Sequence, residues 1–294
     1  MGIPASLRRP SPASSLLSRL LSTAPPPSPP PRTTLVFGAN TDVGKSLLTA
    51  GLVLSRVSRG KPAYYLKPLQ CGRPADEAFL RRHLPPGLSA DLRAAVTLFD
   101  WPDHPCSPHL ASFLSCSLPG AAYPSGVSSG EVLAEVEARL SLPFPPAAAV
   151  FVETAGGVLS PGPTAVHSSP PPNHTRHGDS DHYYTTQAAL YSPLPHPALL
   201  VADPRLGGVS CTLSALEALL SRGYAVPAVA FVRGGGEPLL DNAGCVRDYL
   251  RGASPGTVVC EVPAPPEMPE PLGGYYGDRA VLDAFGELDD ALGT

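Results

Sequence analysis

The chain has 294 residues, with 21 Lys or Arg against 25 Asp or Glu, and its formal net charge is −4 at pH 7. It contains no basic stripe and no apolar run near the roughly 20 residues that a membrane helix needs, so nucleic acid and membranes are not expected partners. Its six cysteines are scattered without a C-x-x-C pair, so neither a structural zinc site nor a disulfide framework is indicated.

The first 32 residues differ in composition from the rest of the chain. They hold four arginines and no acidic residue, and four leucines between positions 16 and 21 would share one face of a short helix. This pattern is typical of an organelle transit peptide, and a disordered tail is the alternative. The run APPPSPPP at 24–31 is expected to be a stiff spacer before the fold. The roughly 260 residues that follow suit one α/β domain.

The segment 33–48, TTLVFGANTDVGKSLL, is typical of a strand, a glycine-containing loop and the start of a helix. Such a loop points backbone N–H groups and the positive end of the helix dipole at one place, which binds phosphate. Lys45 can reach the β- and γ-phosphates of a nucleotide, and the Ser46 hydroxyl is placed to bind magnesium. The glycine stands at Gly38 instead of position 39, so the loop is one residue longer than the common P-loop pattern. An ordinary strand-to-helix turn is the alternative.

Five further apolar runs follow the loop, at 62–66, 148–152, 198–202, 227–232 and 257–262. Helical patterns occur between several of them, at 131–140, 212–221 and 242–250. Near-continuous apolar strands that alternate with helices predict an α/β fold with a doubly wound, mostly parallel sheet. Ligands of such sheets bind at the carboxyl ends of the strands, so we expect functional residues just after each run.

Three of these positions carry a charged residue: Lys67, Glu153 and Asp203. A lysine beside a phosphate site can stabilise developing negative charge, and a carboxylate can hold magnesium. Taken singly, Lys67 also suits a solvated surface position and Asp203 a helix cap. Their shared position at one edge of the sheet favours the functional interpretation.

At these residues the sequence resembles the ATP-dependent dethiobiotin synthetases, and particularly the form found at the N-terminal side of fused eukaryotic biotin enzymes. The resemblance covers about residues 33–271 and rests on GANTDVGKS (38–46), YLKPLQCG (65–72), CSPHLAS (106–112), VETAGGVLSP (152–161), LVADPRLGGVS (200–210) and CEVP (260–263). It implies a P-loop NTPase-like fold, a homodimer and a mitochondrial matrix location. Residues 1–32 would then be transit peptide and spacer, and 33–294 the synthetase domain, with a disordered insertion at about 163–186.

Carried over residue by residue, the resemblance implies binding sites for ATP and Mg²⁺. The ATP phosphates would be bound by Asp42, Val43, Gly44, Lys45, Ser46 and Leu47. Magnesium would be bound by Ser46, Asp76 and Glu153, with Glu77 as the alternative to Asp76. The catalytic residues would be Lys67 and Lys45. The substrate 7,8-diaminopelargonate would lie beside Thr41, Cys71, Gly156 and Gly157.

The sequence departs from the family pattern at two of these places. Cys71 stands where a hydroxyl residue is usual, and a thiol is a weaker hydrogen-bond donor. Bacterial members read adenine with an Asn-Asp pair where this chain has Arg233 followed by three glycines. Recognition of the base is therefore expected to be looser, or to fall on Pro263, Ala264 and Pro265.

The insertion at 163–186 carries four histidines, which is a pattern that metal sites share. Its polar and proline-rich surroundings favour a mobile surface loop instead.

The reaction that the resemblance implies is the work of a ligase. An amine of 7,8-diaminopelargonate takes up carbon dioxide, supplied as bicarbonate, to form a carbamate. The carbamate oxygen attacks the γ-phosphate of ATP, and the second amine closes the ring with loss of phosphate. Catalysis of this kind needs positioning and charge stabilisation instead of a protein nucleophile.

Two other functions fit parts of the pattern. A regulatory P-loop ATPase usually carries a second lysine in its phosphate loop, and residues 39–43 have none. A non-catalytic leader domain of a biotin-pathway fusion would not need Lys45, Ser46, Lys67 or Glu153. Cys71 and Arg233 keep that second alternative open.

Overall fold

β1 (Arg32–Gly38) lies at the centre of a seven-stranded sheet with the strand order β3-β2-β4-β1-β7-β8-β9. The computed structural model describes residues 30–84, 94–116, 124, 126–164, 184–233, 241–266 and 272–293. All strand pairs described in this sheet are parallel. The other strands are β2 (Ala63–Cys71), β3 (Ala95–Trp101), β4 (Ala149–Gly157), β7 (Ala198–Val201), β8 (Ala228–Val232) and β9 (Val258–Val262). A separate antiparallel pair is formed by β5 (Pro161–Thr164) and β6 (Tyr184–Thr186).

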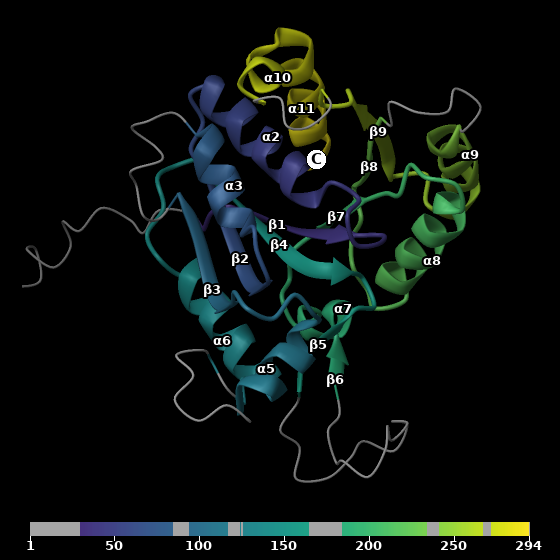
Figure 1. Ribbon diagram of the computed structural model, residues 1–294. Coiled ribbons are helices and arrows are strands. Elements are labelled where there is room, and N and C mark those ends of the chain that lie inside the picture. The colour runs from purple at the N-terminus through teal and green to yellow at the C-terminus, as the bar shows by residue number, and fades with distance from the viewer. Residues whose placement is uncertain are drawn as a thin grey trace, which may run out of the picture.

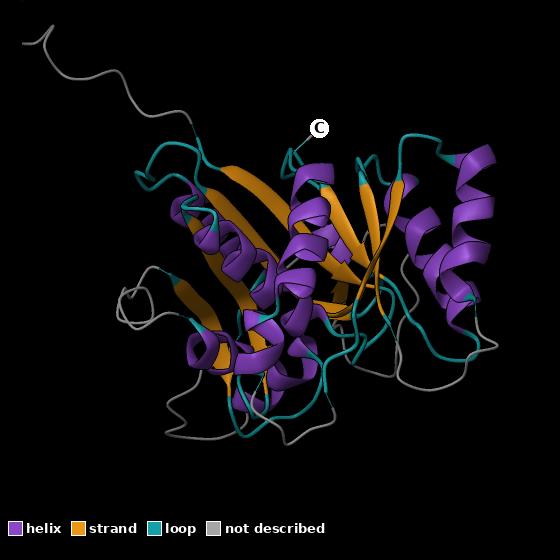
Figure 2. Ribbon diagram, turned by 90° about the horizontal axis from the view of Figure 1, so that it is seen from above, coloured by secondary structure: helices purple, strands orange, loops and turns teal. Residues whose placement is uncertain are grey.

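Helices cover both faces of the sheet (Figures 1 and 2). One face packs against α2 (Lys45–Ser58), α3 (Asp76–His83), α10 (Gly273–Gly277) and α11 (Arg279–Ala291). The opposite face packs against α5 (Pro108–Cys116), α6 (Ser129–Leu140), α7 (Gln187–Leu190), α8 (Gly208–Leu220) and α9 (Asn242–Ala253). No described helix has the length and apolar character that crossing a bilayer requires.

Successive residues of the central strand face the two different cores. In β1, Leu35 and Phe37 lie in the core under α7 and α8, whereas Val36 lies in the core under α2, and all three are fully buried. A strand buried on both faces reads as a continuous apolar run, because neither set of alternate side chains meets water. The α/β fold with a doubly wound parallel sheet is therefore confirmed.

Two strands extend further than their apolar runs. β2 continues from Leu66 to Cys71, and β4 continues to Gly157. β2 pairs with β4 only through Leu66, and beyond that residue it pairs with β3 alone. Lys67 and Glu153 are thus strand residues, and the expectation that they follow the strands is wrong. The sheet opens between β2 and β4 at this point, which leaves room for their polar side chains.

The fold begins earlier than the sequence suggests. Arg32, which was assigned to the N-terminal spacer, is the first residue of β1, and its backbone N–H donates to the Ala148 carbonyl at 2.9 Å. Its guanidinium forms an ion pair with the Asp289 carboxylate. The boundary after residue 32 is therefore at least one residue too late.

The proposed insertion at 163–186 also needs correction at its ends, because Pro163, Thr164 and residues 184–186 belong to β5 and β6. Its four histidines lie outside the described residues.

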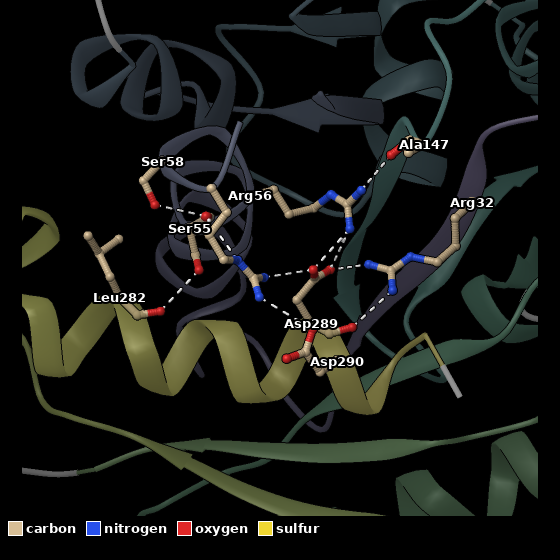
Figure 3. Close-up of polar contacts among 9 residues, drawn as sticks. Arg32, Ser55, Arg56, Ser58, Ala147, Leu282, Asp289 and Asp290 are labelled. Carbon is tan, nitrogen blue, oxygen red and sulfur yellow. Dashed lines mark hydrogen bonds and ion pairs between the residues drawn. The ribbon is translucent and has the colours of Figure 1, made fainter. Parts of the chain in front are cut away.

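Asp289 joins three segments that are far apart in the sequence (Figure 3). Its side chain is 1% exposed and lies near the end of α11. Arg56 Nη1 and Arg59 Nη2 from the end of α2 approach its Oδ2 at 2.9 and 2.8 Å, and Arg32 contacts its Oδ1. Burial lowers the pKa of Arg56, and the Asp289 charge opposes that effect. One carboxylate thus anchors the start of β1, the end of α2 and the end of α11.

We expect Asp289→Ala to lower the free energy of unfolding by about 2–3 kcal/mol, because three arginines lose their common partner. A fully buried pair that loses one partner costs roughly 3–5 kcal/mol, and the partial exposure of Arg32 and Arg59 reduces this cost through solvent screening. Urea denaturation followed by circular dichroism measures the change. The matched control is Asp290→Ala, since Asp290 is the next residue and its side chain is 68% exposed. A comparable loss in both variants would contradict the anchoring role of Asp289.

Candidate active site

The loop between β1 and α2 is closely packed around the Lys45 side chain. A Cβ atom at Gly38 would lie 2.7 Å from the Asn40 carbonyl oxygen and 3.0 Å from Lys45 Nζ, so only glycine fits there. Gly44 has φ of 92°, in the left-handed region, and as the N-cap of α2 it offers no side-chain cap. The first N–H groups of α2 are therefore left for a ligand, which is the arrangement that binds phosphate.

Lys67 is held between two carboxylates where β2 and β4 separate. Its Nζ lies 2.7 Å from Asp76 Oδ2 and 2.9 Å from Glu153 Oε1. The Ser46 hydroxyl donates to the same Glu153 oxygen at 2.8 Å. Four elements thus meet here: α2 supplies Ser46, β2 supplies Lys67, α3 supplies Asp76 and β4 supplies Glu153.

The charges in this cluster compensate one another although the side chains are buried. Burial lowers the pKa of Lys45, and the Glu153 charge opposes this effect only in part. Burial would also lower the pKa of Lys67, but the Glu153 and Asp76 carboxylates outweigh it and raise that pKa. Burial would raise the pKa of Asp76, but the Lys67 charge outweighs it and lowers that pKa. Lys67 and Asp76 therefore form a charged pair at neutral pH.

The oxygen donors around Lys67 suit a hard divalent cation. Ser46, Asp76 and Glu153 supply one hydroxyl and two carboxylates, and magnesium is usually bound by one or two carboxylates together with substrate phosphates and water. No cluster of three or more His, Cys, Asp or Glu side chains able to hold a metal occurs in the described part of the chain. The donor set therefore fits a magnesium ion that a nucleotide helps to bind.

The residues expected beside the substrate surround the same loop. A Cβ atom at Gly157 would lie 3.4 Å from the Ala39 carbonyl oxygen, so the end of β4 at Gly156 and Gly157 packs directly against the loop. The exposed Thr41 accepts a hydrogen bond from Arg205 Nη2 through its carbonyl at 3.3 Å. Cys71 ends β2 and is half-buried, and burial raises the pKa of its thiol to about 12. The thiol is thus neutral at physiological pH.

The segment expected to contact the base follows β9. Pro263, Ala264 and Pro265 are half-buried there, and the Tyr275 hydroxyl donates to the Pro263 carbonyl at 2.7 Å. The neighbouring Tyr276 hydroxyl donates to the Leu47 carbonyl at 2.9 Å. The tyrosine pair of α10 therefore connects this segment to the helix that begins at the phosphate loop, a link that was not predicted from the sequence.

Two charged residues near the loop form ion pairs. Asp203 neither caps α8, whose N-cap is Gly207, nor presents a free carboxylate, because Arg205 Nε and Nη2 lie 2.8 and 2.7 Å from its two oxygens. These hydrogen bonds hold the pKa of Asp203 below its usual value. Arg233 pairs with Glu261 at 3.3 Å on the surface, and the three glycines after it lie outside the described residues.

Three features define a P-loop nucleotide-binding protein: the open N-terminus of α2, the Lys45 side chain packed against its loop, and the oxygen donors of Ser46 and Glu153 beside them. Comparison with known proteins narrows this class. The chain is 31% identical over 199 residues to an ATP-dependent dethiobiotin synthetase from Novosphingobium aromaticivorans, with 67% of this chain and 74% of that protein covered. The chain belongs to the dethiobiotin synthetase family.

Fused eukaryotic proteins are also similar to this chain. It is 36% identical to a bifunctional dethiobiotin synthetase/adenosylmethionine-8-amino-7-oxononanoate aminotransferase from Emericella nidulans, over 80% of this chain and 25% of that protein. It is 32% identical to a mitochondrial bifunctional dethiobiotin synthetase/7,8-diamino-pelargonic acid aminotransferase from Oryza sativa, over 87% of this chain and 33% of that protein. The chain thus spans a quarter to a third of the length of these fused relatives. No family model matches it.

Proposed function

We propose that this protein is a dethiobiotin synthetase, a ligase that uses ATP and magnesium to carboxylate 7,8-diaminopelargonate and close the ring of dethiobiotin. The observation that carries the proposal is Lys67, held by Asp76 and Glu153 at the strand edge beside the phosphate loop. A generic P-loop ATPase has no need of a buried cation there. Relatives named as ATP-dependent dethiobiotin synthetases support the same assignment.

In this proposal the phosphate loop positions the nucleotide. Residues 42–47 bind the phosphates through backbone N–H groups, and Lys45 stabilises the charge that spreads over the transferred phosphoryl group. Ser46, Asp76 and Glu153 would hold magnesium, which when bound neutralises charge between the β- and γ-phosphates. The adenine base would lie near residues 263–265, at the end of β9.

The substrate would lie on the other side of the transferred group. An amine of 7,8-diaminopelargonate takes up carbon dioxide as a carbamate, and the carbamate oxygen attacks the γ-phosphorus with ADP as the leaving group. The second amine then attacks the carbonyl carbon of the mixed anhydride, which closes the ring and releases phosphate. The carbamate and the γ-phosphate are both anionic, and the Lys67 charge would offset their repulsion. Thr41, Gly156 and Gly157 would orient the diamine, and Cys71 would add a weak hydrogen bond from its neutral thiol.

The test of this proposal is the formation of dethiobiotin by the purified protein. We expect product only when the diamine, bicarbonate, ATP and magnesium are all present. ATP hydrolysis that does not depend on the diamine would favour a regulatory ATPase instead. Failure to bind ATP at all would favour a non-catalytic leader domain.

We also propose that the protein acts in the mitochondrial matrix, since plant relatives are named as mitochondrial. A homodimer is proposed from the resemblance of the sequence alone. The segment expected to direct import lies almost entirely outside the described residues. We expect residues 1–31 to carry a fused fluorescent protein into mitochondria, and replacement of Arg8, Arg9 and Arg19 by Gln to abolish import, because transit peptides need positive charge. Fluorescence microscopy measures this. Cytosolic retention of the unaltered fusion would refute the import signal.

A further inference from the structure

Two polar atoms in the core beside the candidate active site make no hydrogen bond of good geometry with any described residue. One is the hydroxyl of Tyr65, a residue of β2 that is 1% exposed. The other is Oε2 of Glu153, whose residue is fully buried and whose Oε1 holds Ser46 and Lys67. A buried polar group left without a partner costs roughly 1–3 kcal/mol, so these two atoms destabilise the fold unless they pair with each other.

The strand register brings these two side chains to the same face of the sheet. Tyr65 is paired with Phe151 of β4, and Glu153 is two residues further along that strand. Side chains two residues apart in a strand share one face, and both Tyr65 and Phe151 lie in the core under α2. A tyrosine is long enough to reach its diagonal neighbour on the next strand. In agreement with this placement, burial raises the pKa of Tyr65 most, and the charge of Glu153 and a hydrogen-bond contact with its side chain raise it further.

We propose that the Tyr65 hydroxyl donates a hydrogen bond to Glu153 Oε2 and so positions this carboxylate for magnesium and Lys67. With Oε2 held from behind, Oε1 keeps facing Ser46 and Lys67 at the open edge of the sheet. Tyr65 itself is a positioning residue, because it acts only through Glu153. The inference rests on the proposed function, since it assigns Glu153 to magnesium.

The chain offers a matched control one residue away. Tyr64 points to the opposite face of the sheet, where its ring packs edge-on against Phe144 with the centroids 5.0 Å apart. Tyr64→Phe and Tyr65→Phe therefore make the same chemical change on the same strand. Only the second change removes a hydroxyl from the neighbourhood of Glu153.

The experiment compares both variants with the unaltered protein in two assays. Calorimetry measures the magnesium concentration that gives half-maximal enhancement of ATP binding, and steady-state kinetics measures kcat and the KM for the diamine. For Tyr65→Phe we expect the magnesium requirement to rise about tenfold and kcat to fall about tenfold, as for the loss of one hydrogen bond to a charged group. The diamine KM should change less than about twofold, because the positioning effect falls on the transition state. Tyr64→Phe should leave all three values unchanged.

Two results would overturn this inference. One is an unchanged magnesium requirement in Tyr65→Phe, and the other is an equal effect in Tyr64→Phe, which would indicate core packing. A melting curve for each variant checks that both are folded. If the unaltered protein forms no dethiobiotin, the proposed function fails, and the calorimetric comparison still decides whether Tyr65 positions Glu153.

Discussion

Replacement of Lys45 by Ala is expected to reduce ATP turnover by more than two orders of magnitude while the protein stays folded. The Lys45 side chain is 8% exposed and lies over the phosphate loop, with Nζ 3.0 Å from the position of a Cβ atom at Gly38. Its charge would meet the phosphates in a site from which water is largely excluded. Loss of one such contact costs about 3 kcal/mol or more in the transition state, which corresponds to at least a hundredfold in rate.

The fold should tolerate this change, because burial already disfavours the charged form of Lys45 and lowers its pKa. Removal of a buried charge relieves that cost and leaves the apolar core under α2 in place. The control is Lys61→Ala, since Lys61 is exposed and lies just beyond the opposite end of the same helix. ATP turnover and urea denaturation of both variants give the comparison. An unchanged turnover number in Lys45→Ala would refute the phosphate-loop assignment.

Strands that are buried on both faces were the easiest part of the fold to predict. Continuous apolar runs marked β1, β4, β7 and β8, because nearly every side chain along them is buried in a core. An apolar run also marked β9, although β9 is an edge strand and most of its side chains are only half-buried. β3 was not predicted, since it is an edge strand in which polar residues such as Thr97 and Asp100 are only half-buried. Its mixed sequence, AVTLFDW, does not distinguish a strand from a loop.

The last helix shows a signal that was present in the sequence but not used. Val281, Phe285, Leu288 and Leu292 repeat at helical spacing and are all buried against the sheet. The Phe285 ring fills the space in front of Gly51 on α2, where a Cβ atom would lie 2.1 Å from it. The partnership of Asp289 with Arg32, in contrast, spans 257 residues. No local sequence pattern indicates which of the many charged residues pair across such a separation.

The candidate site was predictable in part because Lys67 and Glu153 each follow the apolar run of a parallel strand. The structure places Lys67 Nζ 2.9 Å from Glu153 Oε1, although both residues lie within their strands instead of after them. Asp76 was assigned only by resemblance, because it begins a helix that follows a loop. Its backbone N–H donates to the Gln70 side chain at 3.2 Å, a contact that helps to fix the helix start beside Lys67. Tyr65 was not considered, since a tyrosine within an apolar run reads as core.

A substitution at Lys67 distinguishes a dethiobiotin synthetase from an ATPase that only hydrolyses ATP. In such an ATPase the hydrolytic machinery lies with the phosphate loop and its metal, so a lysine within β2 is dispensable. In a dethiobiotin synthetase the anionic carbamate must approach an anionic phosphoryl group. A cation between them offsets the repulsion. Because Lys67 is only 3% exposed, water screens these charges little.

Lys67→Gln is therefore expected to lower dethiobiotin formation by two or more orders of magnitude, with ATP affinity within a few-fold of the unaltered protein. Glutamine keeps much of the length and polarity but removes the charge that Asp76 and Glu153 share. The variant should also unfold more easily without nucleotide, because those two carboxylates lose their common partner. ATP binding and single-turnover product formation, measured together at saturating magnesium, separate the two roles, with Lys61→Gln as the control. Equal loss of binding and chemistry, or loss of neither, would show that Lys67 does not act on the carbamate.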